Sequence, residues 1–119
     1  MTPEIHTKRI YAEASPKDGV RILVDRLWPR GLKKENVQAE WAKELAPSTE
    51  LRQWFNHAVP LWGDFEKRYK TELKKNPAVD DFLQQHRHEK LITLLYAAKN
   101  TGHNHALVLK DFLEEQFSK

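Results

Sequence analysis

The chain of 119 residues contains no cysteine. This absence excludes disulfide bonds, thiolate catalysis and cysteine-based zinc sites, and it suits a reducing compartment. No apolar run approaches the roughly 18 residues that a membrane-spanning helix requires, and the opening MTPEIHTKRI lacks the apolar segment of a signal peptide. We therefore expect a cytoplasmic protein with no membrane partner.

The chain also lacks repeats, low-complexity tracts and linker-like stretches. Its length and its 39% hydrophobic content suit one domain, residues 1–119, with a substantial core. There is no glycine-rich phosphate loop and no Gly-x-Ser-x-Gly motif, so we expect no nucleotide cofactor, and no other cofactor is expected either.

The charge is only mildly basic, with a net +3 and a pI of about 9.2. Lysine and arginine are spread along the whole chain. This distribution favours an ordinary solvated surface over a nucleic-acid footprint.

Three segments have the pattern of strands. Residues 20–27 (VRILVDRL) and 91–98 (LITLLYAA) are strong candidates, and residues 5–11 are a weaker one. The run 91–98 is almost continuously apolar, which is typical of a strand covered on both faces. A long helical crossover separates the two strong strands, so we expect them to pair in parallel.

Apolar residues at helical spacing fill the rest of the chain, and Asn36, Ser48, Asn76 and Asn104 are placed to cap helices. The first of these helices, residues 36–45, would bury Val37, Trp41 and Leu45. The others are expected near 48–55, 61–73, 77–83 and 104–113. The expected fold class is α/β, a single small domain with a few-stranded mixed sheet and helices packed around it.

The most informative stretch is residues 23–31 (LVDRLWPRG), where an apolar run ends in charged and aromatic residues. Arg26 and Arg30 carry fixed positive charge, and Trp28 offers a wide flat surface. This combination at a strand exit is typical of a site for a planar or anionic ligand. The alternative is that Arg26 pairs with Asp25 or with a carboxylate on a helix.

Parallel pairing would bring further residues to the same edge of the sheet. Asn104 begins a helix whose unpaired N–H groups favour anions, and Arg52 is another candidate for holding charge. Tyr96, near the end of the second strand, either reaches the site or closes the core. The predicted ligand-binding residues are therefore Arg26, Trp28, Arg30, Arg52, Tyr96 and Asn104.

Six histidines raise the question of a metal. The pairs His86–His88 and His103–His105 flank the strand 91–98, which separates them by about 25 Å at about 3.3 Å per residue. Each pair alone offers two ligands without a carboxylate, so we expect no metal site. His57 and His105 are the better candidates for proton transfer, because histidine titrates near neutral pH.

Asp25 is a third candidate for catalysis, as a general base, although an aspartate beside an arginine more often orients that arginine.

The successive motifs LVDRLWPRGL, WAKELAPSTELRQWFNH, LWGDFEKRYKTEL, LITLLYAAKN and NHALVL resemble the YeaO-like family of bacterial proteins of unknown function. The likeness runs from about Ile5 to Leu113. It implies a small α/β fold and a cytoplasmic bacterial protein, and it implies no reaction, cofactor or catalytic residue.

The leading hypothesis is that the protein binds, with or without processing it, a small anionic or phosphate-bearing ligand at the strand-end edge. The second hypothesis is a nucleic-acid-binding module that uses the basic balance and Trp28. The third is a protein-interaction domain without a ligand.

Overall fold

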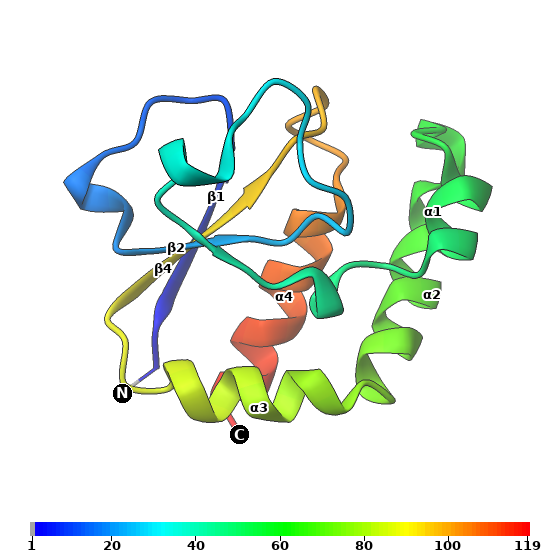
Figure 1. Ribbon diagram of the computed structural model, residues 1–119. Helices are drawn as coiled ribbons and strands as arrows, with labels where there is room; N and C mark the ends of the chain where they lie inside the picture. Colours follow the sequence, from blue (N-terminus) through cyan, green and yellow to red (C-terminus); the bar gives the residue numbers. More distant parts are fainter. Residues whose placement is uncertain (1) are drawn as a thin grey trace.

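The computed structural model describes residues 2–119, and in this part of the chain four strands lie beside four α-helices (Figure 1). The strands are β1 (Glu4–Arg9), β2 (Val20–Leu23), β3 (Glu40–Trp41) and β4 (Leu91–Tyr96). The helices are α1 (Thr49–Phe55), α2 (Trp62–Lys74), α3 (Pro77–His86) and α4 (His105–Phe117). Short 3-10 turns occupy Pro16–Asp18, Lys34–Asn36, Lys43–Leu45 and Val59–Leu61.

The sheet has the order β1-β4-β2-β3, and every neighbouring pair of strands is parallel. The α/β class and the parallel pairing of the two strong strands are confirmed. The expectation of a mixed sheet is wrong in this detail, because even the short β3 returns to run in the same direction as β2. The parallel arrangement places the carboxyl ends of β2 and β4 at one edge.

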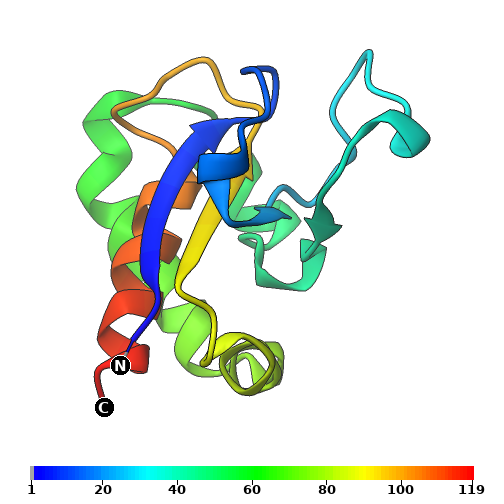
Figure 2. The ribbon, with the colours of Figure 1, turned by 90° about the vertical axis from the view of Figure 1, so that its left-hand side faces the viewer.

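One face of the sheet is covered by helices and holds the main core (Figure 2). Ile5, Ile22, Ile92 and Leu94 point to this side from the three longer strands. They meet aromatic and aliphatic residues of the helices, among them Phe65, Tyr69, Leu73, Leu109 and Phe112. Ser48, Asn76 and Asn104 cap α1, α3 and α4 through their side-chain oxygens, as expected.

The opposite face of the sheet is covered by irregular chain, chiefly the segment between β2 and β3 (Figure 2). Ile10, Leu23 and Leu95 are buried here beneath the partly exposed Trp28 and Trp41. The strand β4 is therefore covered on both sides, as its apolar sequence predicted, but only one of the two covers is helical.

Beside this smaller cluster lies a buried carboxylate, Asp18. It accepts hydrogen bonds from Lys8 Nζ at 3.1 Å, from the Arg21 guanidinium and from the backbone N–H of Ser15 at 3.0 Å. Burial alone would raise the pKa of Asp18, but these hydrogen bonds outweigh burial and hold the pKa below its ordinary value of 3.8. Its backbone carbonyl accepts from Thr93 Oγ1 at 2.6 Å, which joins the turn to β4.

The helix expected at residues 36–45 is not formed. This segment contains two 3-10 turns with β3 between them, and Ala42 N donates to Leu23 O at 2.8 Å. Val37, Ala39 and Trp41 all pack on the smaller cluster. Their spacing of two is the period of a strand, and it takes precedence over the spacing of four that includes Leu45.

Candidate ligand-binding cavity at the strand ends

A cavity of about 270 Å³ lies beyond the carboxyl ends of β2 and β4. Its walls come from the exits of these two strands, the segment before α1, α1 itself, α2 and the start of α4. The lining residues are Asp25, Arg26, Leu27, Ala46, Pro47, Arg52, Phe55, His57, Phe65, Ala97, Ala98, His103, Asn104 and His105. We call this space the strand-end cavity. The edge at which it lies is where open parallel sheets generally bind ligands.

Arg26 is held in place by the chain that precedes α1. Its Nε donates to Pro47 O at 3.0 Å and its Nη2 donates to Ala46 O at 3.1 Å. Within residues 2–119 it has no carboxylate within ion-pair distance. The alternative in which Asp25 or a helix carboxylate neutralises this arginine is therefore not observed, and Arg26 brings a positive charge to the cavity.

Asp25 joins the two strand exits and the start of α4. Its Oδ2 accepts the backbone N–H of Ala97 at 3.1 Å, and its buried Oδ1 lies 3.0 Å from His105 Nε2 without hydrogen-bond geometry. His105 Nε2 also lies 3.0 Å from Val24 O. Because both neighbours are acceptors, Nε2 carries the proton, and this nitrogen is committed to contacts inside the protein.

The helix α1 contributes Arg52 and, just past its end, His57. Both side chains are largely exposed, and Arg52 has no ion-pair partner in the described chain. Asn56 and His57 have φ values of 44° and 58°, so two successive residues adopt the left-handed region. Asparagine tolerates this conformation well, whereas for His57 it costs free energy. The reversal turns the chain sharply at the cavity wall.

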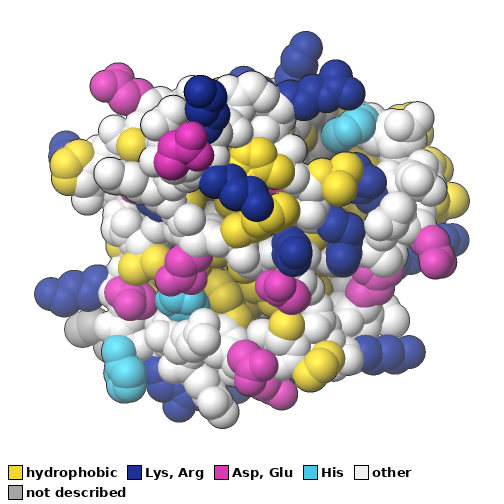
Figure 3. Space-filling view, viewed as in Figure 1, with side chains coloured by type: hydrophobic (Ala, Val, Ile, Leu, Met, Phe, Trp, Pro, Cys, Tyr) yellow, Lys and Arg dark blue, Asp and Glu magenta, His cyan; other side chains and the backbone are white. Residues whose placement is uncertain are grey.

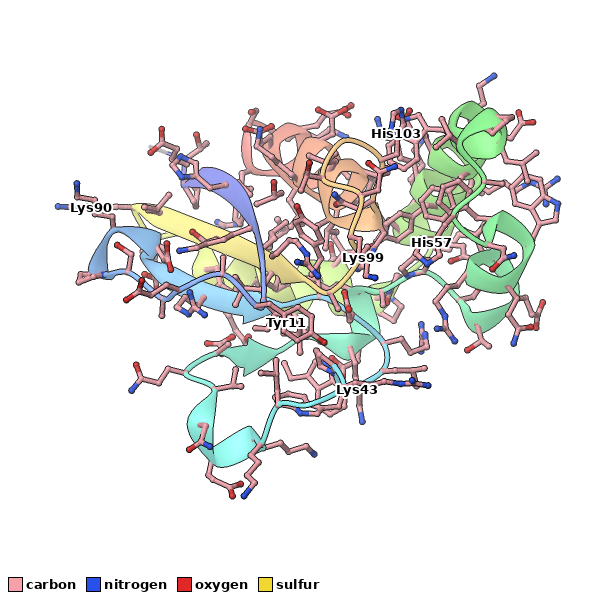
Figure 4. The ribbon with its side chains drawn as sticks, turned by 90° about the horizontal axis from the view of Figure 1, so that it is seen from above. Tyr11, Lys43, His57, Lys90, Lys99 and His103 are labelled. Carbon is pink, nitrogen blue, oxygen red and sulfur yellow. The ribbon has the colours of Figure 1, made fainter. Side chains whose placement is uncertain are left out.

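Aromatic residues form the inner wall of the cavity. Phe55 and Phe65 are stacked with their ring centroids 4.3 Å apart, and Trp62 lies against both. His103 meets the edge of Trp62 at a centroid distance of 5.2 Å. Figure 4 shows the loop that carries Lys99 and His103 facing the end of α1 at His57.

Asn104 lines the cavity but uses its amide in local contacts. Its Oδ1 caps α4 by accepting from Leu107 N at 3.2 Å, and its Nδ2 donates to Asn100 O at 3.0 Å. The side chain is almost completely buried. Asn104 therefore shapes the cavity and starts α4, and its side chain has little remaining capacity for a ligand.

Three of the predicted ligand-binding residues lie elsewhere. Tyr96 is buried in the main core. Arg30 is exposed and is not a lining residue, and its carbonyl accepts from Tyr11 Oη at 2.9 Å. Trp28 packs on the smaller cluster on the other face of the sheet, and its indole N–H donates to Leu32 O at 2.6 Å.

The rings of Trp28 and Trp41 are engaged by side chains of the protein itself. They meet edge to face at 5.2 Å, and Lys34 Nζ lies 5.6 Å from one ring centroid and 5.0 Å from the other. Figure 3 shows lysine and arginine side chains lying among hydrophobic ones over this segment between β2 and β3. A ligand that stacked on Trp28 would have to displace these contacts.

The histidine pairs lie at opposite ends of β4. His103 and His105 line the strand-end cavity, whereas His86 ends α3 and packs against Phe82 with its Nε2 3.3 Å from Glu40 Oε2. Within residues 2–119, no three His, Cys, Asp or Glu side chains are grouped to hold a metal ion. None of the helices described for residues 2–119 is both long enough and apolar enough to cross a bilayer.

The sequence patterns did not single out the apolar part of the cavity. Phe55 and Phe65 were expected only as core residues, and His103 only as a surface or capping histidine. One sequence signal could have indicated that His103 lines the cavity. His103 and His105 flank the cap residue Asn104, and the segment that follows a parallel strand lies at the edge of the sheet where ligands generally bind.

A parallel sheet covered on one face by helices, with a cavity of mixed polar and apolar character at its carboxyl edge, defines a small α/β protein. The chain belongs to the family described as the inactive DUF488-N3 subclade, whose model matches residues 4–119. The predicted resemblance to YeaO-like proteins is confirmed.

The chain is 48% identical over 110 residues to the uncharacterized protein YeaO of Escherichia coli (strain K12), which covers 92% of this chain and 96% of that protein. It is 34% identical over 110 residues to the uncharacterized protein Rv3073c of Mycobacterium tuberculosis (strain H37Rv), with 92% of each chain covered. The uncharacterized protein Mb3100c of Mycobacterium bovis shows the same identity and coverage. No solved structure matches the chain.

Proposed function

We propose that this protein is a cytoplasmic binding module, with residues 1–119 acting as one domain, that holds a small anionic ligand in the strand-end cavity. The observation that carries the proposal is the presence of Arg26 and Arg52 in one cavity without a carboxylate partner for either in residues 2–119. Two guanidinium groups in a partly enclosed space favour an anion, including a phosphate-bearing one.

A binding role is favoured over a reaction for two reasons. The family is described as inactive. In addition, Asp25 and His105 face each other and the strand exits, so two of the three candidates for acid–base chemistry already serve as structural links. His57 is the remaining candidate for proton transfer, and no second polar side chain is hydrogen-bonded to it in the described chain.

The test is a titration of isotope-labelled protein with inorganic phosphate at constant ionic strength, followed by amide chemical shifts. We expect shifts at Ala97, Ala98 and His103, and a loss of affinity of about tenfold in Arg52→Gln, because about 1.4 kcal/mol is typical of one charge-assisted contact. Arg87→Gln is the matched control, since this exposed arginine lies near Thr2 and Lys119 at the opposite end of the sheet. Equal effects of the two substitutions would contradict the proposal.

The alternative of a nucleic-acid-binding module is supported by the lysines that lie among aromatic rings over the segment between β2 and β3 (Figure 3). Oligonucleotide affinity that falls steeply with salt, and that Lys34→Ala and Arg52→Gln reduce equally, would favour this alternative. A shallow salt dependence with a dominant effect of Arg52→Gln favours the cavity.

A further inference from the structure

The walls of the strand-end cavity restrict the kind of anion that suits it. We propose that the ligand is a carboxylate with a single negative charge on a flat apolar or aromatic body, with the size of a one-ring acid such as benzoate. This inference rests on the proposed function, because it names the ligand class of the same cavity.

The charged part of the cavity matches one carboxylate. The two hydrogen bonds from Arg26 to Ala46 O and Pro47 O fix the plane of the guanidinium group, and its Nη1 makes no hydrogen bond to residues 2–119. A planar fork with N–H groups still available is complementary to the two oxygens of a carboxylate. Arg52 lines the same space from α1 and adds a second positive charge.

A doubly charged ligand is less suited to the cavity. Asp25 lines the same space, so its carboxylate repels a ligand with two negative charges more strongly than a ligand with one. None of the residues that line the cavity is a glycine, so the cavity has no glycine-rich loop of the kind whose backbone N–H groups hold phosphates. One negative charge is therefore favoured over two.

Much of the remaining wall of the cavity is apolar. Phe55 and Phe65, stacked at 4.3 Å, both line the cavity and supply aromatic carbon to its inner wall. Leu27 also lines the cavity and is 60% exposed, so a bound ring would remove this aliphatic side chain from water. The volume of about 270 Å³ lies near the lower limit for small-molecule sites, which suits one ring and excludes a nucleotide.

The experiment compares benzoate, acetate, phenyl phosphate and inorganic phosphate by amide chemical shifts at pH 7 and constant ionic strength. We expect benzoate to bind about tenfold more tightly than acetate, because the ring adds apolar contact. We also expect it to bind more tightly than phenyl phosphate, which has the same ring and more charge. The amides of Ala97 and Ala98 should report the binding of each probe.

Two pairs of variants separate the charged part of the site from the apolar part. Arg52→Gln should weaken benzoate and acetate by the same factor of about ten, whereas Arg87→Gln should weaken neither. Leu27→Ser should weaken benzoate about threefold and leave acetate unchanged. Val59→Ser is its control, because Val59 is an exposed apolar residue that does not line the cavity.

The possible outcomes distinguish this inference from the proposed function. If phosphate or phenyl phosphate binds more tightly than benzoate, the inference is overturned and the anion-binding function stands. Equal affinity for benzoate and acetate also overturns it, because the apolar wall then contributes nothing. If none of the four probes shifts the amides that line the cavity, both proposals fail.

Discussion

The two faces of the sheet are buried in different ways by the same strands. On the helix-covered face, Ile92 and Leu94 meet a continuous apolar layer from α2 and α4. On the other face, Leu95 lies beneath a thin cover of irregular chain, and Thr93 donates to the carbonyl of the charged residue Asp18. A parallel sheet needs both faces covered, but the cover does not need to be helical.

This difference separates two sources of stability. The helix-covered face depends on apolar area and close packing, which respond little to pH. The loop-covered face combines a small apolar cluster with a buried carboxylate held by Lys8 and Arg21, so its stability depends on charge. The comparison can be tested with substitutions on each side.

The largest expected effect comes from neighbouring leucines of β4 that point to opposite faces. Leu94→Ala should lower the free energy of unfolding by about 4 kcal/mol, because the helices around it cannot collapse into the space left behind. Leu95→Ala should cost about 2.5 kcal/mol, since irregular chain relaxes more easily around a lost side chain. Both leucines are fully buried, so they form a matched pair. Chemical denaturation of the two variants measures the difference, and a greater loss in Leu95→Ala would reverse the ranking of the faces.

An intermediate effect is expected from Asp18→Asn, which should lower the free energy of unfolding by about 2 kcal/mol at pH 7. The amide oxygen still accepts a hydrogen bond but carries no charge, so Lys8 and Arg21 lose their ion-pair partner at the edge of the core.

The sign of the pH dependence follows from the lowered pKa of Asp18. A group with a lower pKa in the folded state stabilises the protein above its unfolded pKa, near 3.8, and this contribution is lost as the pH falls through the folded pKa. The difference in unfolding free energy between wild type and Asp18→Asn should therefore be constant above about pH 5 and shrink in more acidic solution. Unfolding curves between pH 7 and pH 2 measure it, and a difference that grows on acidification would show that the carboxylate does not have this role.

The smallest effect is expected from Arg30→Ala, at less than about 0.5 kcal/mol, because the side chain is exposed and the carbonyl that Tyr11 contacts is retained. Arg26→Ala should cost about 1.5 kcal/mol, since two carbonyl groups lose their donor. Thermal or urea unfolding of the two variants compares them. Equal losses would mean that the contacts of Arg26 contribute nothing to the fold.

Much of the architecture was predictable because its signals are local. The apolar runs around Ile22 and Leu94 indicated buried strands, and their separation by helices indicated parallel pairing. Ser48, Asn76 and Asn104 were identifiable as caps from their type and position. Placing both strand exits at the same edge predicted that Arg26 and Asn104 lie near one depression, and both line the cavity, whereas Arg52 and His57 reach it from α1, which the strand pairing did not indicate.

The remaining features depend on contacts that no local pattern contains. Trp41 fits a helical spacing with Leu45 and a strand spacing with Ala39, and only the pairing of β3 with β2 decides between them. Trp28 and Arg30 follow Arg26 closely in sequence, yet the chain turns towards the loop-covered face after Leu27. Proximity in sequence to a strand exit therefore did not determine which residues face the cavity.

The carboxylate of Asp25 has a consequence for hydrogen exchange and for how the cavity can open. It accepts the N–H of Ala97, just past the last residue of β4, and it also faces His105 at the first turn of α4. The Ala97 amide can therefore exchange with solvent only in openings that separate the end of β2 from that of β4. We therefore expect the floor of the cavity to open only together with this part of the sheet.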